Sequence, residues 1–245
     1  MSSETTQWYA SWFNTPYYHI LYRDRDHVEA HEFMDRLTRH LKLNKDAHIL
    51  DLACGRGRHS IYLNKIGYEV TGLDLSEESI QYARQFENDR LHFDMHDMCM
   101  PYKKQFDAVF NLFTSFGYFE HDADNLKTIK AIQSDLKPEG LAVIDFMNVP
   151  FVAKNLIAEN VKSVDGITFK LNRRIEDGHI IKEIKFADGD EDFFFTYSVK
   201  ALRLHDFQAM FNEANLKLVE ICGDYHLNPF VESTSERLIM IFKRL

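Results

Sequence analysis

The sequence of 245 residues contains few cysteines, and their placement excludes several kinds of fold and site. The three are far apart, odd in number and without a CxxC pair: Cys54, Cys99 and Cys222. This pattern argues against a disulfide framework and against a zinc module. Free thiols fit a reducing compartment. We therefore expect a cytoplasmic protein.

Long hydrophobic runs and an excess of positive charge are also missing. No apolar run approaches the roughly 20 residues that cross a bilayer, and residues 1–10 lack the basic and apolar regions of a signal peptide. The formal net charge is −9 at pH 7, whereas nucleic-acid binding normally needs a basic patch. These absences argue against a nucleic-acid or membrane partner, and we expect a monomer or a homodimer.

What is present is an alternation of short apolar runs with amphipathic stretches. The predicted strands are 47–52, 68–73, 91–95, 106–113, 141–146, 216–222 and 237–243. The predicted helices are 57–65, a stretch from residue 76, 122–136 with a stop signal at 137–140, and 204–215. This alternation predicts a Rossmann-like α/β fold, doubly wound, with a mostly parallel seven-stranded sheet.

The chain is expected to form a single domain whose second half carries an insertion. Asp177–Gly178 is a strong hairpin signal, and a second turn signal follows at 188–190. These turns predict an antiparallel β meander inserted after the fifth strand of the sheet. We assign residues 1–45 to an N-terminal helical cap, 46–158 to a cofactor-binding core, 159–203 to the meander, and 204–245 to a C-terminal helix with the closing strands.

The N-terminal segment is dense in aromatic residues and leads into an amphipathic helix predicted at 26–43. The aromatic residues are Trp8, Tyr9, Trp12, Phe13, Tyr17, Tyr18 and Tyr22. They can pack as ordinary core, or they can cover a ligand site. We favour a cover, because the segment precedes the first strand and is free to cross the carboxyl edge of the sheet, where open α/β folds bind ligands. Alternate rings of Phe193–Phe195 are expected to line or roof the same site.

The most informative motif, DLACGRGRHS at residues 51–60, directly follows the first predicted strand. Its glycines, Gly55 and Gly57, allow a strand to turn sharply into a helix while the backbone approaches a ligand closely. The third glycine of the dinucleotide fingerprint is missing. Asp51 ends the strand, and its negative charge would repel a pyrophosphate but suits a sulfonium cofactor that carries an amino group. The motif therefore favours S-adenosylmethionine (SAM) over NAD.

Two further acids follow the next two strands. Asp74 ends the second strand, where a carboxylate can accept hydrogen bonds from both ribose hydroxyls, a feature shared with NAD enzymes. Asp97 follows the third strand, where it can accept the adenine amino group while Met98 packs on the ring. Alone, Asp97 would be an ordinary turn residue. Because Asp51 and Asp74 stand at the ends of the two preceding strands, Asp97 favours binding of an adenosine group at this edge of the sheet.

Together these segments resemble the class I SAM-dependent methyltransferase family. The resemblance covers roughly residues 48–148, and its specific part is DLACGRGRHS. It implies that the following residues bind SAM: Asp51, Ala53, Gly55, Gly57, Asp74, Leu75, Asp97, Met98 and Asn111. By their position, Tyr22 and Arg23 are expected to close over the cofactor, with Arg23 paired to its carboxylate.

The resemblance points to the branch of the family that methylates small molecules, because the Asn/Asp-Pro-Pro-Tyr/Phe signature of amino-methylating nucleic-acid enzymes is absent. It implies direct in-line transfer of a methyl group from SAM to a small-molecule acceptor, which leaves S-adenosyl-L-homocysteine (SAH). The protein would mainly supply proximity and orientation. Where a general base is needed, the candidates are Tyr18, His19, Tyr118, His121 and His226, of which Tyr18, Tyr118 and His121 are assigned as the catalytic residues.

Other functions remain open at this point. One is methylation of a protein or an RNA, of which the acidic charge disfavours the RNA more. A non-catalytic SAM-binding sensor or scaffold would need the same cofactor residues, and an NAD-dependent oxidoreductase would need the glycine loop to hold a pyrophosphate. A metal site is not expected. His92, Asp94 and His96 share one face of a strand, but no further Cys or His pair stands at ligand spacing.

Overall fold

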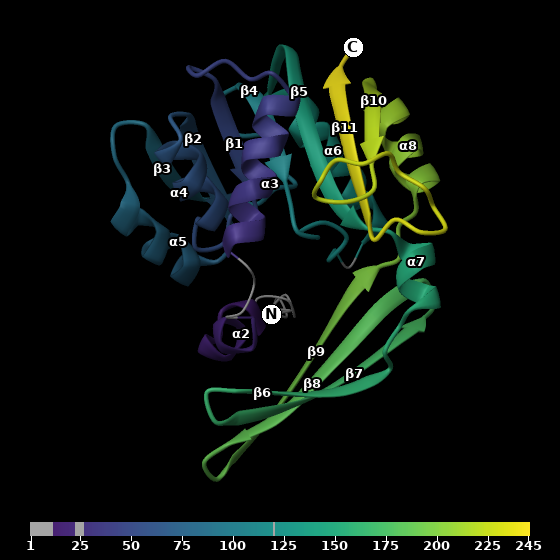
Figure 1. The fold of residues 1–245 in the computed structure, drawn as a ribbon. Helices are drawn as coiled ribbons and strands as arrows, with labels where there is room; N and C mark the ends of the chain where they lie inside the picture. The colour runs from purple at the N-terminus through teal and green to yellow at the C-terminus, as the bar shows by residue number, and fades with distance from the viewer. Residues whose placement is uncertain (1–11, 23–26, 120) are drawn as a thin grey trace, which may run out of the picture.

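The computed structural model describes residues 12–22, 27–119 and 121–245, and its larger sheet has seven strands. Their order is β10-β11-β5-β4-β1-β2-β3 (Figure 1). The strands are β1 (His48–Leu52), β2 (Glu69–Asp74), β3 (Leu91–Met95), β4 (Phe106–Asn111), β5 (Leu136–Met147), β10 (Leu216–Cys222) and β11 (Arg237–Arg244). β1 to β5 pair in parallel, whereas β11 is antiparallel to both of its neighbours. The predicted Rossmann-like sheet is confirmed.

Helices cover both faces of this sheet (Figure 1). Ile49 packs in a cluster with α3, α4 and α5, whereas the next residue, Leu50, packs in the cluster of α6 and α8 on the opposite face. All five residues of β1 are buried, as expected of a central parallel strand. The helices are α3 (His27–His40), α4 (Arg58–Lys65), α5 (Glu77–Ala83), the 3₁₀ turn η1 (Arg84–Phe86), α6 (Asp122–Asp135) and α8 (Leu204–Glu213). In the described part of the chain, no helix combines the length and apolarity needed to cross a membrane.

A second sheet, the meander, is inserted between β5 and α8 and extends away from the seven-stranded sheet (Figure 1). It follows the short helix α7 (Val149–Lys154), and its antiparallel strands are β6 (Glu159–Val164), β7 (Ile167–Glu176), β8 (His179–Asp188) and β9 (Glu191–Lys200). The turn at Asp177–Gly178 has φ of 48° and 73° at its two residues, as a tight hairpin requires. The predicted meander is confirmed.

The N-terminal segment packs against the meander. Helix α2 (Pro16–Leu21) follows Trp12, whose side chain is 0% exposed. Trp12 and Leu21 share a hydrophobic cluster with Phe169 and Phe186 of the meander. Part of the aromatic segment is therefore core, while neighbouring rings face the cavity described below. Trp8 and Tyr9 lie outside the described residues.

One predicted boundary is wrong. The stop signal at 137–140 was expected to separate helix 122–136 from a strand that begins at 141, but β5 begins at Leu136, directly after α6. Leu136 is buried and pairs with Phe106, and a register shift between Phe106 and Ala108 absorbs the irregular residues. Lys137 also donates to Asp107 at 2.8 Å. Burial of Leu136 in the core therefore favours a strand that begins at this residue, despite the proline and glycine that follow.

Asp135, the last residue of α6, is expected to make stability depend on pH. It is 2% exposed, and its carboxylate accepts the backbone N–H of Tyr102 at 2.8 Å. Burial raises its pKa from 3.8 to about 7. Because the folded-state pKa lies above the ordinary value, the ionised carboxylate destabilises the fold at about pH 8, and this cost shrinks as the pH falls. Asp135→Asn should therefore raise the melting temperature at about pH 8 by a few degrees.

The measurement is thermal unfolding between about pH 5 and pH 8, with Asp89→Asn as the control on an exposed carboxylate. The advantage of Asp135→Asn over the wild type should shrink toward the acidic end, whereas the effect of Asp89→Asn should stay flat. An Asp135→Asn advantage that does not change with pH would contradict the prediction.

Candidate functional site

The sheet places its ligand site where the path of the chain reverses. β1 and β4 are neighbours, but the chain leaves β1 toward β2 and leaves β4 toward β5 on the other side. In open α/β sheets, ligands bind in the crevice beyond the carboxyl ends of such strands. The loops after β1, β2, β3 and β4 converge at this edge.

The loop from β1 to α4 contains two left-handed glycines with different tasks. Gly55 and Gly57 have φ of 56° and 82°. A Cβ on Gly57 would lie 2.7 Å from Cζ of Phe93, so this glycine lets α4 begin close against the sheet. A Cβ on Gly55 would meet nothing within 4 Å, so the backbone there borders open space.

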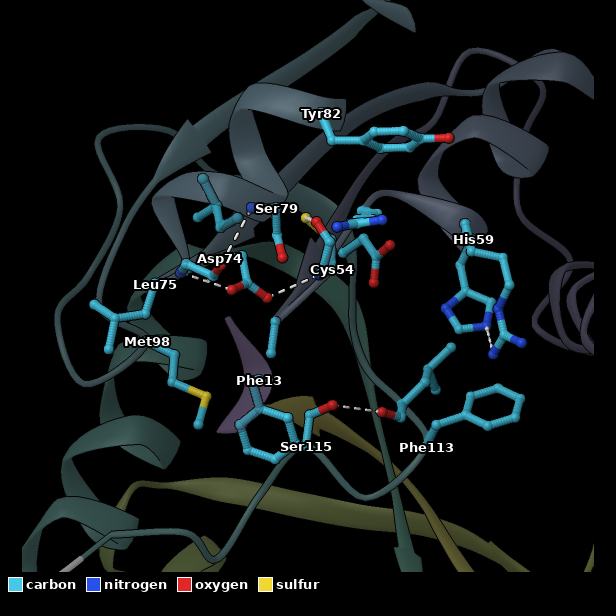
Figure 2. A pocket seen from close by; sticks show the side chains of 18 of the residues that line it. Phe13, Cys54, His59, Asp74, Leu75, Ser79, Tyr82, Met98, Phe113 and Ser115 are labelled. Carbon is cyan, nitrogen blue, oxygen red and sulfur yellow. Dashed lines mark hydrogen bonds between the residues drawn. The ribbon is translucent and has the colours of Figure 1, made fainter. Parts of the chain in front are cut away.

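Two carboxylates fix this loop. Asp74 accepts the backbone N–H of Gly55 with one oxygen and that of Ser76 with the other, both at 2.8 Å (Figure 2). Burial raises its pKa above 3.8. Asp51 is 2% exposed and accepts the hydroxyl of Ser60 at 2.6 Å. Burial raises the pKa of Asp51 to about 6. Both acids sit at the wall of the cavity with the loop held in place between them.

The larger cavity at this edge has a volume of about 900 Å³. Figure 2 shows Asp74, Leu75 and Met98 on one side of it and His59 and Phe113 on the other. The predicted cofactor residues that line it are Asp51, Ala53, Gly55, Asp74, Leu75, Asp97, Met98 and Tyr22. The predicted catalytic residues that line it are Tyr18 and Tyr118.

Four of the predicted site residues are not placed in this lining. Gly57 caps α4 behind the loop. Asn111 is 0% exposed and donates to the carbonyl of Leu52 at 3.0 Å, so it ties β4 to β1 beneath the cavity. His121 is exposed, immediately precedes α6 and does not line the cavity. Arg23 lies outside the described residues.

Several lining residues were not predicted from the sequence. His59 stacks on Phe113 with ring centroids 4.8 Å apart, and the guanidinium of Arg58 lies 4.9 Å from the centroid of the same ring. Tyr82 and Ser79 line the cavity from α5 (Figure 2). Both His59 and Arg58 belong to the DLACGRGRHS motif and begin α4. Their place at a helix N-terminus facing the ligand edge was the available signal.

The turn after β4 is strained and is held by a buried ion pair. Phe113 and Thr114 have φ of 56° and 60°, which residues other than glycine adopt only at a cost. Asp145 accepts the backbone N–H of Phe113 at 2.8 Å, and Arg237 donates to the hydroxyl of Thr114 at 2.8 Å. Asp145 and Arg237 pair with each other at 2.7 Å. The hydroxyl of Tyr225 also donates a hydrogen bond to Asp145, at 3.2 Å.

The opposite wall is aromatic and joins the N-terminal segment to the meander. The rings of Phe13 and Tyr118 meet edge to face with centroids 5.6 Å apart. The hydroxyls of Tyr22 and Tyr197 are 3.1 Å apart. Lys182 donates to the hydroxyl of Tyr22 at 2.6 Å. Burial raises the pKa of Tyr197 well above 10, so its phenol stays protonated.

The predicted role of Phe193–Phe195 as a roof is wrong. Phe193 and Phe195 pack with Phe186 inside the meander, and Phe194 is 57% exposed on its other face. Tyr197 lies on the same face of β9 as Phe195, and it is Tyr197 that lines the cavity. The predicted face was right, but the position that reaches the cavity is nearer the end of the strand.

Asp94, part of the His-Asp-His pattern of β3, takes part in ion pairs. It lies 3.6 Å from both Arg84 and Lys103 and accepts the hydroxyl of Tyr102. Burial is the largest single influence and acts to raise its pKa, but the hydrogen bond from Tyr102 and the charges of Lys103 and Arg84 together lower it. Across 12–22, 27–119 and 121–245, no three His, Cys, Asp or Glu side chains are grouped as a metal site would need.

A second cavity of about 490 Å³ adjoins the first. The two cavities share Tyr22, Arg58, Phe113, Thr114, Tyr118 and Tyr197 as lining residues. A ligand in the larger cavity therefore borders the space that opens toward the meander and β11.

Comparison with known proteins points to one family. A family model described as a methyltransferase domain matches residues 43–191. YqeM of Bacillus subtilis is 37% identical over 127 residues, which are 49% of this chain and 51% of that protein. The dTDP-3-amino-3,4,6-trideoxy-alpha-D-glucopyranose N,N-dimethyltransferase of Streptomyces venezuelae is 27% identical over 185 residues, or 71% of this chain and 77% of that protein. The chain thus spans about half the length of the first and about three quarters of the second.

A solved structure has the same architecture. An S-adenosylmethionine-dependent methyltransferase from Clostridium acetobutylicum superposes with a TM-score of 0.78, covering 93% of this chain and 96% of that one. The sequence identity is 22%. At this identity the likeness shows a shared fold.

The two glycines of the loop should respond differently to alanine. Gly57→Ala combines a left-handed backbone with a contact on Phe93, whereas Gly55→Ala has only the backbone cost. Urea unfolding should show a loss of about 1 kcal/mol for Gly55→Ala and about 2 kcal/mol or more for Gly57→Ala. Gly166→Ala is the matched control, because Gly166 has the same φ of 82° and open space around its Cβ position. A loss for Gly57→Ala no larger than for Gly166→Ala would rule out the contact with Phe93.

Proposed function

Because the chain belongs to the class I SAM-dependent methyltransferase family, we propose that it transfers the methyl group of SAM to the amino group of a small molecule. The observation that carries the proposal is the pair of joined cavities at the carboxyl edge. Acidic and glycine residues form the wall at one end, and tyrosines and cations form it at the other. Such a division suits one molecule that binds as cofactor and one that binds as acceptor.

The larger cavity fits SAM, which supplies a methyl group already activated on a sulfonium when it is bound. Gly55 leaves room for close approach to the backbone. Each oxygen of Asp74 already accepts one backbone N–H and retains acceptor capacity for a ribose hydroxyl. Leu75 and Met98 provide apolar surface for the adenine, beside Asp97. The negative charge of Asp51 favours a positively charged amino group.

An amine is the acceptor group that the lining favours. An amine attacks only in its neutral form, and neighbouring cations disfavour the ammonium form. Arg58, Lys182 and Arg237 line the space on the acceptor side. The name of the Streptomyces venezuelae relative, an N,N-dimethyltransferase of an amino sugar, also specifies an amine as the acceptor of that enzyme.

The tyrosines would orient the acceptor rather than take its proton. Tyr197 remains protonated because burial raises its pKa. Its hydroxyl and that of Tyr22 form one hydrogen-bonded pair, anchored by Lys182. Tyr18 and Tyr118 complete the wall on the same side. Their contribution is proximity and alignment, which can supply much of the rate enhancement when the donor is already reactive.

The proposal is tested by transfer from methyl-labelled SAM to a panel of small primary and secondary amines. We expect label in amines and none in the corresponding alcohols. Asp74→Ala should weaken SAH binding at least about tenfold in calorimetry, because it removes the carboxylate that fixes Gly55 and faces the cavity. Glu77→Ala removes an exposed acid from the first turn of α5 and should bind SAH as the wild type does.

Two results would count against the proposal. Labelling of alcohols in place of amines would contradict the acceptor chemistry while leaving the cofactor site in place. Tighter binding of NAD than of SAM, or unchanged SAH affinity in Asp74→Ala, would contradict the cofactor site itself.

The ionisation of Asp51 should make cofactor binding depend on pH. Its pKa of about 6 means that the carboxylate is mostly charged at about pH 7.5 and mostly neutral at about pH 5. SAH carries a positive amino group, so its affinity should fall on acidification. In Asp51→Asn that part of the pH dependence should disappear. The difference between the two proteins isolates Asp51, because the described histidines of the lining, His19, His31, His59 and His96, are present in both. Parallel pH curves for the two proteins would refute this role.

A further inference from the structure

The second cavity is lined by several cationic side chains, and binding of the cofactor in the larger cavity does not explain them. We propose that it binds an anionic group, a carboxylate or a phosphate, of the acceptor whose amine is methylated. This inference rests on the proposed function and specifies its substrate class. The acceptor would then be a molecule with an amine at one end and a negative charge at the other.

The position of the cavity suits the far end of an acceptor. It lies beyond the residues that it shares with the larger cavity, among them Phe113 and Tyr118. Its outer wall comes from α7, from β7 and β8 of the meander, and from β11. An acceptor whose amine reaches the larger cavity past the shared residues would leave its remaining groups here.

The charge of the lining is the main argument. Within the described residues, it holds four cationic side chains from four different elements, Arg58, Arg173, Lys182 and Arg237, and one carboxylate, that of Glu29. Glu29 lies in α3 and is exposed. Positive charges gathered around a partly enclosed space are costly unless an anion joins them. Guanidinium groups match the two-oxygen geometry of carboxylates and phosphates.

Arg237 and Arg173 differ in the kind of protein group that each of them contacts. Arg237 pairs with Asp145, and its pKa is raised by that carboxylate although burial opposes the charge. Arg173 instead donates to the amide oxygen of Asn160 at 2.6 Å and to the carbonyl of Ile157 at 3.3 Å. These neutral acceptors hold the guanidinium in place without cancelling its charge. Arg173 is therefore the cation best suited to meet a ligand anion.

Lys182 adds a positive group from the middle of the meander. It is 8% exposed, and its ammonium lies 4.9 Å and 5.7 Å from the ring centroids of Tyr22 and Tyr197. The hydrogen bond to Tyr22 fixes it on the cavity wall. Apolar neighbours such as Ile180 and Val199 limit water there, which strengthens any charge–charge attraction.

The charge of the lining and the amine chemistry are consistent. The same cations that attract an anion disfavour a protonated amine nearby. A molecule that carries both groups is bound through one and kept reactive at the other. For an amine without an anionic group, the cations would disfavour the protonated form but would not contribute to binding.

The test uses SAH-loaded protein and two matched pairs of amines in calorimetry. Sarcosine against sarcosinamide probes a carboxylate, and glucosamine 6-phosphate against glucosamine probes a phosphate. We expect the anionic member of one pair to bind at least about tenfold more tightly than its neutral partner. The pair that shows the preference identifies the kind of anion.

Arg173→Ala should reduce this preference to about twofold or less while SAH affinity stays as in the wild type. Arg174→Ala is the matched control: Arg174 is the next residue of β7, is exposed, and pairs with Glu176 and Glu183 outside both cavities. It should keep the full preference. Absence of a preference in both pairs, or a preference that survives Arg173→Ala, would overturn the inference. Loss of SAH binding by the wild type would instead overturn the proposed function.

Discussion

The carboxylate of Asp145 is the constraint on which the acceptor side of the site depends. It is fully buried, and it receives the guanidinium of Arg237, the hydroxyl of Tyr225 and the backbone N–H of Phe113. These donors come from β11, from the loop before it and from the turn after β4. A buried ion pair of this kind is strongly destabilising when one partner is lost, because the other is left charged and unpaired. Asp145 thus compensates for the left-handed turn that brings Phe113 and Thr114 to the cavity.

The two halves of the site have different origins in the chain. The cofactor half is built from loops that each directly follow a parallel strand, so their carboxyl-edge position is a property of the sheet. The proposed acceptor half is assembled from residues 12–22, the meander and β11, which are far apart in the sequence. Insertions and termini can change without disturbing the sheet. One fold can therefore retain its cofactor and change its acceptor.

This difference also explains what sequence reasoning could and could not predict. Asp51, Gly55, Asp74 and Asp97 were found because each stands at a fixed short distance from the end of a strand. His121 was a candidate base, but it directly precedes α6 and does not line the larger cavity.

Residues of the acceptor side were harder to predict. The aromatic run of β9 predicted the correct face but not that Tyr197, rather than Phe193 or Phe195, reaches the cavity. That depends on how the meander is placed against the sheet, which no local pattern records. Arg173 gave no signal in the sequence for the same reason, since it joins Arg58 and Arg237 only in the lining of the second cavity.

The attachment of the N-terminal segment couples the two halves thermodynamically. Trp12 packs against Phe195, and the hydroxyl of Tyr17 donates to Asp188 at 3.0 Å, so the segment is fastened to the meander. The same segment contributes Phe13 and Tyr18 to the larger cavity. A ligand that orders the meander would therefore also order Phe13 and Tyr18 at the larger cavity. Such a linkage is reciprocal: whatever free energy the acceptor adds to retention of the cofactor, the cofactor adds equally to retention of the acceptor.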